Sequence, residues 1–299
     1  MSREFMHMNA ADAFPISYAF DKQNGADTDL KALSHQDRLS LKTLQTLSQV
    51  LSKTPTGLTL LTQATSYHFK IAFDAALDAD ASVFNDHSGI LFMPAFNDSY
   101  ISVKKNMGRA LLTFIAGLRR ALVTNQKHMH RFDLEPMEYA RLIRILEADI
   151  DTVTTQVAWE LRTAGETAPW RCLLAGDKGD LGFVYSQTIG KYTTGQFDGR
   201  IMRQVFRQWF AHPERVNAAD HFALEMLDMA LSYPDQFDIT ADKKLTKNDL
   251  RLVQKNLPFS NYLADINVFG RWFDGFKDAF NQAHLHHIIG DLCHYKDKS

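Results

Sequence analysis

Two long stretches with helical spacing of apolar residues constrain the fold of this chain most strongly. Between 106 and 126, apolar side chains recur at three- and four-residue intervals, and the same spacing continues from 136 to 164. Pro136 suits the first turn of the second stretch and Gly165 its end. The pattern predicts two long amphipathic helices, each with one buried face.

Short segments with strand character precede these helices. Residues 69–73 alternate apolar and other side chains, and 81–85 and 89–93 are further apolar runs separated by a turn-forming stretch. They predict a small antiparallel sheet of about three strands. The expected fold class is therefore α+β, mainly α.

The rest of the chain reads as helices and connections. Thr54 and Pro55 predict the start of a short helix to residue 67, and residues 28–53 predict helices interrupted near 34–35. Six glycines within 166–199 predict a loop-rich connection. The helical segments expected beyond it are 200–210, 218–232, 247–255 and 266–294. We therefore divide the chain into a helical leader (1–53), a core (54–165) and a C-terminal region (166–299).

Composition excludes several classes of protein. A formal charge of −2 argues against a broad nucleic-acid surface, and 45% hydrophobic residues with 23% charged residues are typical of a globular protein. Cys172 and Cys293 cannot form a disulfide framework. No signal-peptide pattern or membrane-spanning apolar run is present. We expect a cytoplasmic protein with no nucleic-acid or membrane partner and an undetermined oligomeric state.

Intact catalytic signatures are absent from the sequence. It contains no P-loop, no dinucleotide-binding glycine fingerprint, no nucleophile elbow, no EF-hand loop, no Cys-x-x-Cys and no His-Glu-x-x-His. The residues themselves therefore specify no reaction.

Several short stretches nevertheless resemble a bacterial family described as putative zinc metallopeptidases. The resemblance spans about residues 54–232. The stretches that carry it are GILFMPA (89–95), LLTFIAGLRRA (111–121), LEAD (146–149), QVAWEL (156–161), VFRQWF (205–210) and RVN (215–217). The resemblance implies a zincin-like core of a small sheet and two long helices. The first of these helices would carry a zinc motif that reads approximately HELRHA.

This chain departs from that motif at the positions that matter for zinc. Matching Leu118, Arg119 and Ala121 to the family pattern places Ala116 and Gly117 where the first histidine and the glutamate belong, and Arg120 where the second histidine belongs. Alanine and glycine supply no ligand or base, and arginine stays protonated. Zinc is therefore the family's cofactor but its ligands are missing here, and we expect no cofactor.

Glu147 matches the third-ligand position implied by the resemblance, and Asp151 follows it by one helical turn. Loss of zinc would leave a partly buried carboxylate without its cation, which is costly. We therefore predict that Arg120 reaches the former metal position and pairs with Glu147, or failing that with Asp151. The competing interpretation is that Arg120 points into solvent.

A second group of potential ligands lies near the C-terminus. His284, His287, Asp291 and His294 fall on one side of a predicted helix, where imidazoles and a carboxylate could bind a transition metal. They extend over about 15 Å, which is too far for one ion, so polar residues flanking a buried face are favoured. His221 and Glu225 form another pair four residues apart, with the same interpretation.

The leading functional hypothesis is a non-catalytic metallopeptidase relative, a pseudoenzyme that binds a protein or peptide through an inherited cleft. The enzyme alternative is a divergent hydrolase that uses other residues, such as Glu147 with Asp151. A third alternative is a structural component that binds no ligand.

Overall fold

The computed structural model describes residues 13–19, 35–96, 102–192, 199–237, 239–254, 257–259, 261–263, 266 and 275–296. Its centre is the predicted helix pair, α4 (Lys104–Asn125) and α5 (Pro136–Thr163), which pack against each other. Pro136 occupies the first turn of α5, and Gly165 just beyond its end has a positive φ of 92°. Both helix predictions are confirmed, and so is the mainly helical α+β class.

The sheet is mixed rather than antiparallel, which corrects the expectation from the sequence. Its strands are β1 (Phe14–Pro15), β2 (Lys70–Asp74), β3 (Val83–Asn85) and β4 (Ile90–Pro94), in the order β1-β2-β4-β3. β4 pairs antiparallel with β3 and parallel with β2, whereas β1 and β2 are antiparallel.

Burial explains this order. All five residues of β4 are buried, so the most apolar strand takes an inner position in the sheet. The turn at residues 86–89 forces β3 and β4 to be antiparallel, and Gly89 there has a φ of 66°. The longer connection at 75–82 lets β4, and not β3, lie beside β2, and the two strands then run in the same direction.

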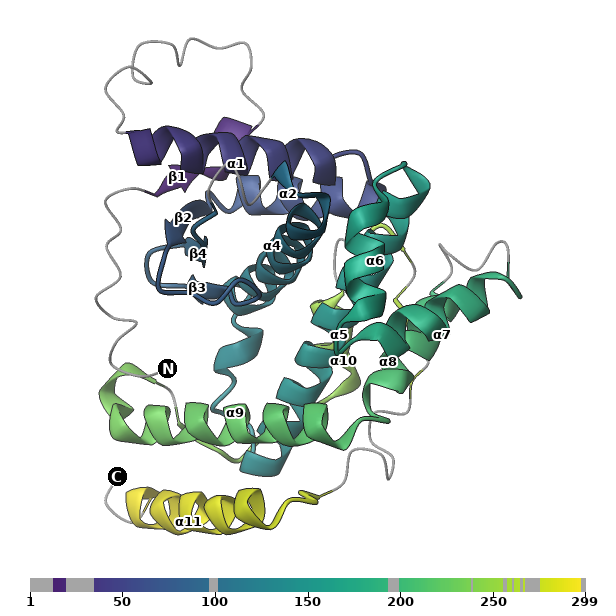
Figure 1. Ribbon diagram of the computed structural model, residues 1–299. Helices are drawn as coiled ribbons and strands as arrows, with labels where there is room; N and C mark the ends of the chain where they lie inside the picture. Colours follow the sequence, from purple (N-terminus) through teal and green to yellow (C-terminus); the bar gives the residue numbers. More distant parts are fainter. Residues whose placement is uncertain are drawn as a thin grey trace.

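Two helices cover the sheet at the top of Figure 1, α1 (His35–Leu51) and α2 (Pro55–Ser66). Thr54 is the N-cap of α2, and its Oγ1 accepts a hydrogen bond from the amide of Gly57 at 3.1 Å. The predicted start at Thr54 and Pro55 is confirmed. α1 begins at His35, and the predicted helical residues 28–34 lie outside the described residues.

The predicted loop-rich connection is wrong, because residues 166–192 fold largely into α6 (Thr167–Ala175) and α7 (Gly179–Ile189). The glycines mark helix ends and close packing instead. Gly176 and Gly190 are C-caps, and a Cβ on Gly182 would lie 2.9 Å from Cδ2 of Leu174. Residues 193–198 lie outside the described part.

The remaining helices follow the prediction with shifted ends. They are α8 (Arg200–Trp209), α9 (Pro213–Ser232), α10 (Lys247–Val253) and α11 (Ala279–Lys296). α9 starts five residues before the predicted residue 218, because Pro213 opens its first turn. Residues 275–278 precede α11 and are not helical, so the predicted start at 266 is wrong. Short 3-10 helices occupy Ile16–Ala19, His128–His130 and Pro234–Gln236.

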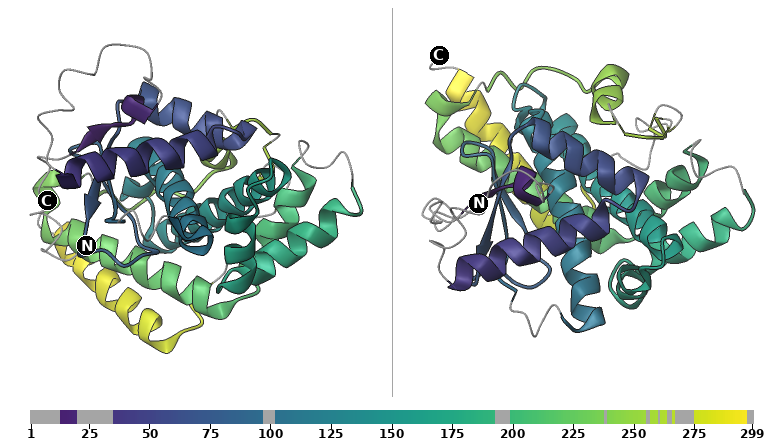
Figure 2. Two further views of the ribbon diagram at one scale, coloured as in Figure 1. Left: turned by 45° about the horizontal axis from the view of Figure 1, so that its top comes forward. Right: turned by 90° about the horizontal axis from the view of Figure 1, so that it is seen from above.

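α5 organises the core. It packs against α2, α4, α6, α8 and α9, and apolar side chains from Phe14 to Leu292 form one continuous buried cluster around it. In Figure 1, α5 lies between the N-terminal helices and α9, and the left view of Figure 2 shows α11 on the outside, beside α9. In the described part of the chain, no helix has both the length and the apolar character needed to cross a membrane. The division into leader, core and C-terminal region stays a prediction.

Candidate functional site

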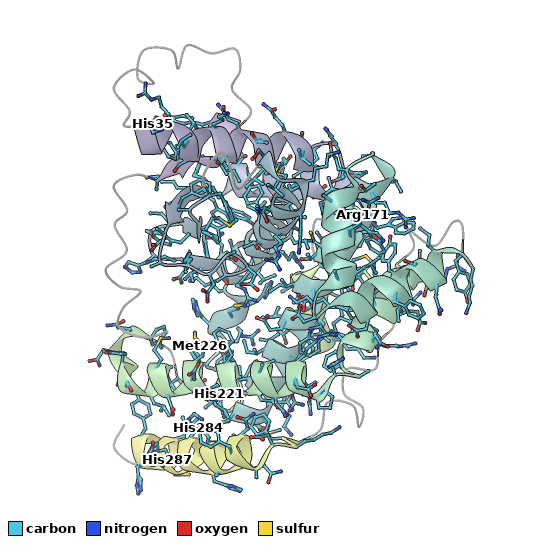
Figure 3. All side chains as sticks on the ribbon, viewed as in Figure 1. His35, Arg171, His221, Met226, His284 and His287 are labelled. Carbon is cyan, nitrogen blue, oxygen red and sulfur yellow. The ribbon has the colours of Figure 1, made fainter. Side chains whose placement is uncertain are left out.

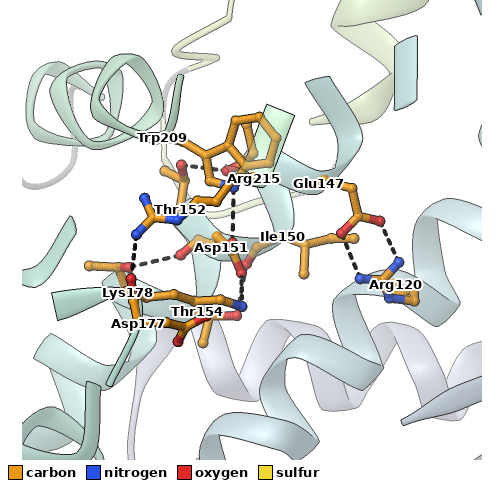
Figure 4. Close-up of polar contacts among 12 residues, drawn as sticks. Arg120, Glu147, Ile150, Asp151, Thr152, Thr154, Asp177, Lys178, Trp209 and Arg215 are labelled. Atoms are coloured by element: carbon orange, nitrogen blue, oxygen red, sulfur yellow. Dashed lines mark hydrogen bonds and ion pairs between the residues drawn. The ribbon is translucent and has the colours of Figure 1, made fainter. Parts of the chain in front are cut away.

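Arg120 and Glu147 form a bidentate ion pair across the central helix pair (Figure 4). Nη2 of Arg120 donates to Oε2 of Glu147 at 2.7 Å, and Nη1 donates to Oε1. The arginine and glutamate side chains are 30% and 19% exposed, so the pair is partly shielded from water. The predicted pairing of Arg120 with Glu147 is confirmed, and the interpretation with Arg120 in solvent is wrong.

Asp151 lies one turn along α5 and has partners of its own. Lys178, at the start of α7, donates from Nζ to Oδ1 of Asp151 at 2.5 Å, and Nε1 of Trp209 donates to Oδ2 at 3.0 Å. Asp151 is therefore not the partner of Arg120. Figure 4 shows these groups as neighbours along one side of α5.

The four charges stabilise one another. Burial alone would lower the pKa of Arg120, but the charge and hydrogen bonds of Glu147, with a smaller contribution from Asp151, raise it. Burial likewise opposes the charge of Lys178, whose pKa is raised by Asp151 and to a lesser extent by Asp177 and Glu147. The cluster of Arg120, Glu147, Asp151 and Lys178 therefore holds two cations and two carboxylates, with no net charge.

Ala116 and Gly117 lie on the turn of α4 before Arg120, where α4 meets the sheet. A Cβ placed on Gly117 would come 2.9 Å from Oγ of Ser82 and 3.2 Å from Cδ1 of Leu91. A glutamate at this position would therefore require the sheet side to shift. The packing gives a structural reason why residue 117 has no side chain.

The residues present do not fit a zinc ion at this helix pair. Ala116, Gly117 and Arg120 offer no side-chain ligand, and both oxygens of Glu147 already accept hydrogen bonds from Arg120. Among the described residues, no group of three or more His, Cys, Asp or Glu side chains could hold a metal ion.

A second arginine–carboxylate pair joins the same two helices and was missed by the sequence reasoning. Nε of Arg119 donates to Oδ2 of Asp149 at 2.7 Å, and neither side chain has any exposed surface. Arg119 also donates from Nη2 to the carbonyl of Val253 at 2.7 Å, while Gln254 and Tyr262 donate to Oδ1 of Asp149. The only local sign of this pair in the sequence was that Arg119 and Asp149 are charged residues among helix positions that are otherwise buried.

The C-terminal histidines do not form one group. Nε2 of His284 lies 2.5 Å from Oδ2 of Asp228 on α9, whereas His287 lies 3.4 Å from Asp291 on the exposed side of α11 (Figure 3). His294 is exposed. His221 and Glu225 approach to 3.4 Å on α9. The structure thus divides the predicted set into separate histidine–carboxylate contacts.

Comparison with known proteins matches the chain to a family model. A model of a family described as a putative metallopeptidase family (DUF6782) matches residues 21–248, which include strands β2 to β4 and the helices from α1 to α9. No curated protein and no solved structure matches the chain. The matched region ends before α11 begins.

Proposed function

The chain belongs to this putative metallopeptidase family, and we propose that it is a non-catalytic member that has lost the zinc site and binds a protein or peptide instead of cleaving it. The observation that carries the proposal is the bidentate contact between Arg120 and Glu147. A guanidinium supplies a permanent positive charge and a planar fork that matches a carboxylate. It therefore takes the place that a metal cation would hold beside Glu147.

The absence of a general base supports the same proposal. Glycine stands at position 117, where the resemblance expects a glutamate, and a longer side chain there would require Ser82 and Leu91 to shift. A peptidase of this kind needs both the metal and a base that activates water. The sheet and the helix pair form without these residues, and binding is a role that such a fold can still serve.

The alternative is a divergent hydrolase that uses Glu147 and Asp151. Both carboxylates are engaged, Glu147 by Arg120 and Asp151 by Lys178 and Trp209. A general acid or base needs an oxygen within reach of the substrate. The observed partners therefore favour binding over catalysis, although both carboxylates lie on the same side of α5.

Metal analysis and a peptidase assay on the full chain test the proposal. After dialysis against zinc, the purified protein should retain no stoichiometric zinc and should not hydrolyse a denatured casein substrate. Stoichiometric zinc that disappears in Glu147→Ala would overturn the loss of the zinc site. Zinc-independent hydrolysis that disappears in Asp151→Asn would favour the divergent hydrolase.

A gain-of-metal variant sharpens this test. The double substitution Ala116→His and Arg120→His places two imidazoles four residues apart on α4 and releases Glu147, so it should bind zinc without peptidase activity. Ala116→His alone is the matched control, since it adds one imidazole and keeps Arg120. If the double variant binds no more zinc than the control, the helix pair is not the former metal position.

A further inference from the structure

Four basic side chains gather where α4 and α6 meet, away from the charge cluster at Arg120. Three lie in the first two turns of α4, and the fourth, labelled in Figure 3, lies on α6. All four are exposed. We define the α4/α6 basic patch as Lys104, Lys105, Arg109 and Arg171.

The position of these charges is unfavourable for the helix. The start of an α-helix carries partial positive charge and is stabilised by acidic residues, yet the first turn of α4 contains no acidic residue and two adjacent lysines. Val103, the N-cap, makes no side-chain capping bond. Within the described part of the chain, none of the four basic side chains forms a hydrogen bond or an ion pair. In that part of the chain, no carboxylate is paired with any of these four positive charges.

Helices α4 and α6 pack closely together beneath the patch. A Cβ on Gly108 would lie 2.8 Å from backbone atoms of Ala168 and from Sγ of Cys172, so the two helices are in close contact here. Sγ of Cys172 donates a hydrogen bond to the carbonyl of Lys105 at 3.2 Å. Burial raises the pKa of the Cys172 thiol, and the nearby charges of Arg109 and Lys105 only partly oppose this. Arg171 precedes Cys172, so α6 adds its charge beside α4.

We propose that the α4/α6 basic patch is the docking surface for an acidic peptide segment of a partner protein. This inference rests on the proposed binding function and names the chemistry of its partner. Glutamate and aspartate side chains would supply the negative charge that α4 lacks at its start, and complementary charge also speeds encounter. Val103, which is 50% exposed beside the two lysines, offers an apolar contact for the same peptide.

An acidic peptide fits this surface better than a nucleic acid. The chain has 33 Lys and Arg against 35 Asp and Glu, so it carries no overall excess of positive charge. Single-stranded nucleic acids are generally bound by a long basic groove with aromatic side chains on which bases stack. Among the described residues at the start of α4, the large exposed apolar side chain is that of Val103.

Fluorescence anisotropy with the full chain tests the docking surface. The probe is a fluorescein-labelled peptide of alternating glutamate and leucine, and the reference probes are the same peptide with lysine for glutamate and a single-stranded DNA of equal charge. The test variant is Lys104→Glu/Lys105→Glu. The matched control is Lys244→Glu/Lys247→Glu, which makes the same charge change at two exposed lysines elsewhere.

We expect wild type and control to bind the acidic peptide with similar affinity, and the test variant to bind about tenfold more weakly. The thermal midpoint of the test variant should not fall, because glutamates suit the start of α4. Equal weakening in the control, no binding by wild type, or tighter binding of the DNA would overturn the proposal. Zinc content and casein hydrolysis, measured on the same preparations, test the proposed function separately from the docking surface.

Discussion

Arg119 and Arg120 are neighbours in the sequence, and each pairs with a carboxylate of α5, but the two pairs lie in different surroundings. Arg119 and Asp149 are fully buried and are joined to Val253, Gln254 and Tyr262. Arg120 and Glu147 are 30% and 19% exposed and face the neighbouring charges of Lys178 and Asp151. Two adjacent residues of α4 therefore form one fully buried ion pair and one partly exposed ion pair.

The difference shows which pair the fold depends on and which is open to change. A fully buried charge has no access to water, so removal of its partner leaves the whole desolvation cost. A pair at the rim can be hydrated when one partner is lost, and its energy is smaller. We infer that the buried pair fastens Val253, Gln254 and Tyr262 to the helix pair, whereas the Arg120–Glu147 pair (the rim pair) contributes less to the fold.

The largest expected effect is at the buried pair. Asp149→Ala would leave Arg119 charged, buried and without its carboxylate, and should lower the free energy of unfolding by about 3–5 kcal/mol. Urea denaturation followed by circular dichroism measures this change. A loss no larger than that of Glu147→Ala would contradict the contrast between the pairs.

A compensating variant separates charge burial from packing. The double substitution Arg119→Met/Asp149→Leu removes both charges and keeps most of the volume, so it should be clearly more stable than Asp149→Ala alone. If the two variants are equally unstable, the packing of the side chains and not their charge determines the loss.

The next effect is at the rim pair. Glu147→Ala should lower the free energy of unfolding by about 1–2 kcal/mol, because Arg120 loses two charge-assisted hydrogen bonds but keeps some contact with water. A double-mutant cycle with Arg120→Ala isolates the coupling between the two side chains. An unchanged unfolding midpoint in Glu147→Ala would mean that the pair adds nothing to stability.

Sequence reasoning found the rim pair and missed the buried one, and the reason lies in where their partners are. Arg120 and Glu147 could be matched to family positions. The acceptor and donors that seal Arg119 and Asp149 come from Val253, Gln254 and Tyr262, more than 100 residues away, and no local periodicity encodes that contact.

The same dependence on contacts between distant residues explains the errors in the fold prediction. Helices α4 and α5 were predictable because their apolar spacing is a local property. The position of β4 between β2 and β3 depends on burial of the completed sheet. The glycines of α6 and α7 resemble loop residues in sequence and show their role only where another side chain, such as Leu174, packs against them.

The free energy of unfolding should also depend on pH through the buried residue His128. Burial, followed by the charges of Arg119 and Arg131, lowers the pKa of His128 below 6.5 in the folded protein. The unfolded chain therefore binds a proton first, and His128 should reduce stability as the pH falls below 6.5, with a slope of at most about 1.4 kcal/mol per pH unit.

Comparison of wild type with His128→Asn isolates this contribution. The difference between their unfolding free energies should be steady above pH 6.5 and should move in favour of the variant below it. The opposite trend, or a constant difference down to acid pH, would show that His128 does not sense the buried charges.

The smallest expected effect on the free energy of unfolding is at Lys178, the most exposed residue of the cluster of Arg120, Glu147, Asp151 and Lys178. Its side chain is 36% exposed, and Asp151 would keep the hydrogen bond from Nε1 of Trp209 after the lysine is replaced. Lys178→Met should therefore cost less than about 1 kcal/mol, because the lost lysine is partly hydrated and Asp151 keeps one hydrogen bond. Urea denaturation of Lys178→Met beside Glu147→Ala measures this ranking. If Lys178→Met costs as much as Glu147→Ala, the four charges act as one unit, and the Arg120–Glu147 pair alone does not account for the stability of this region.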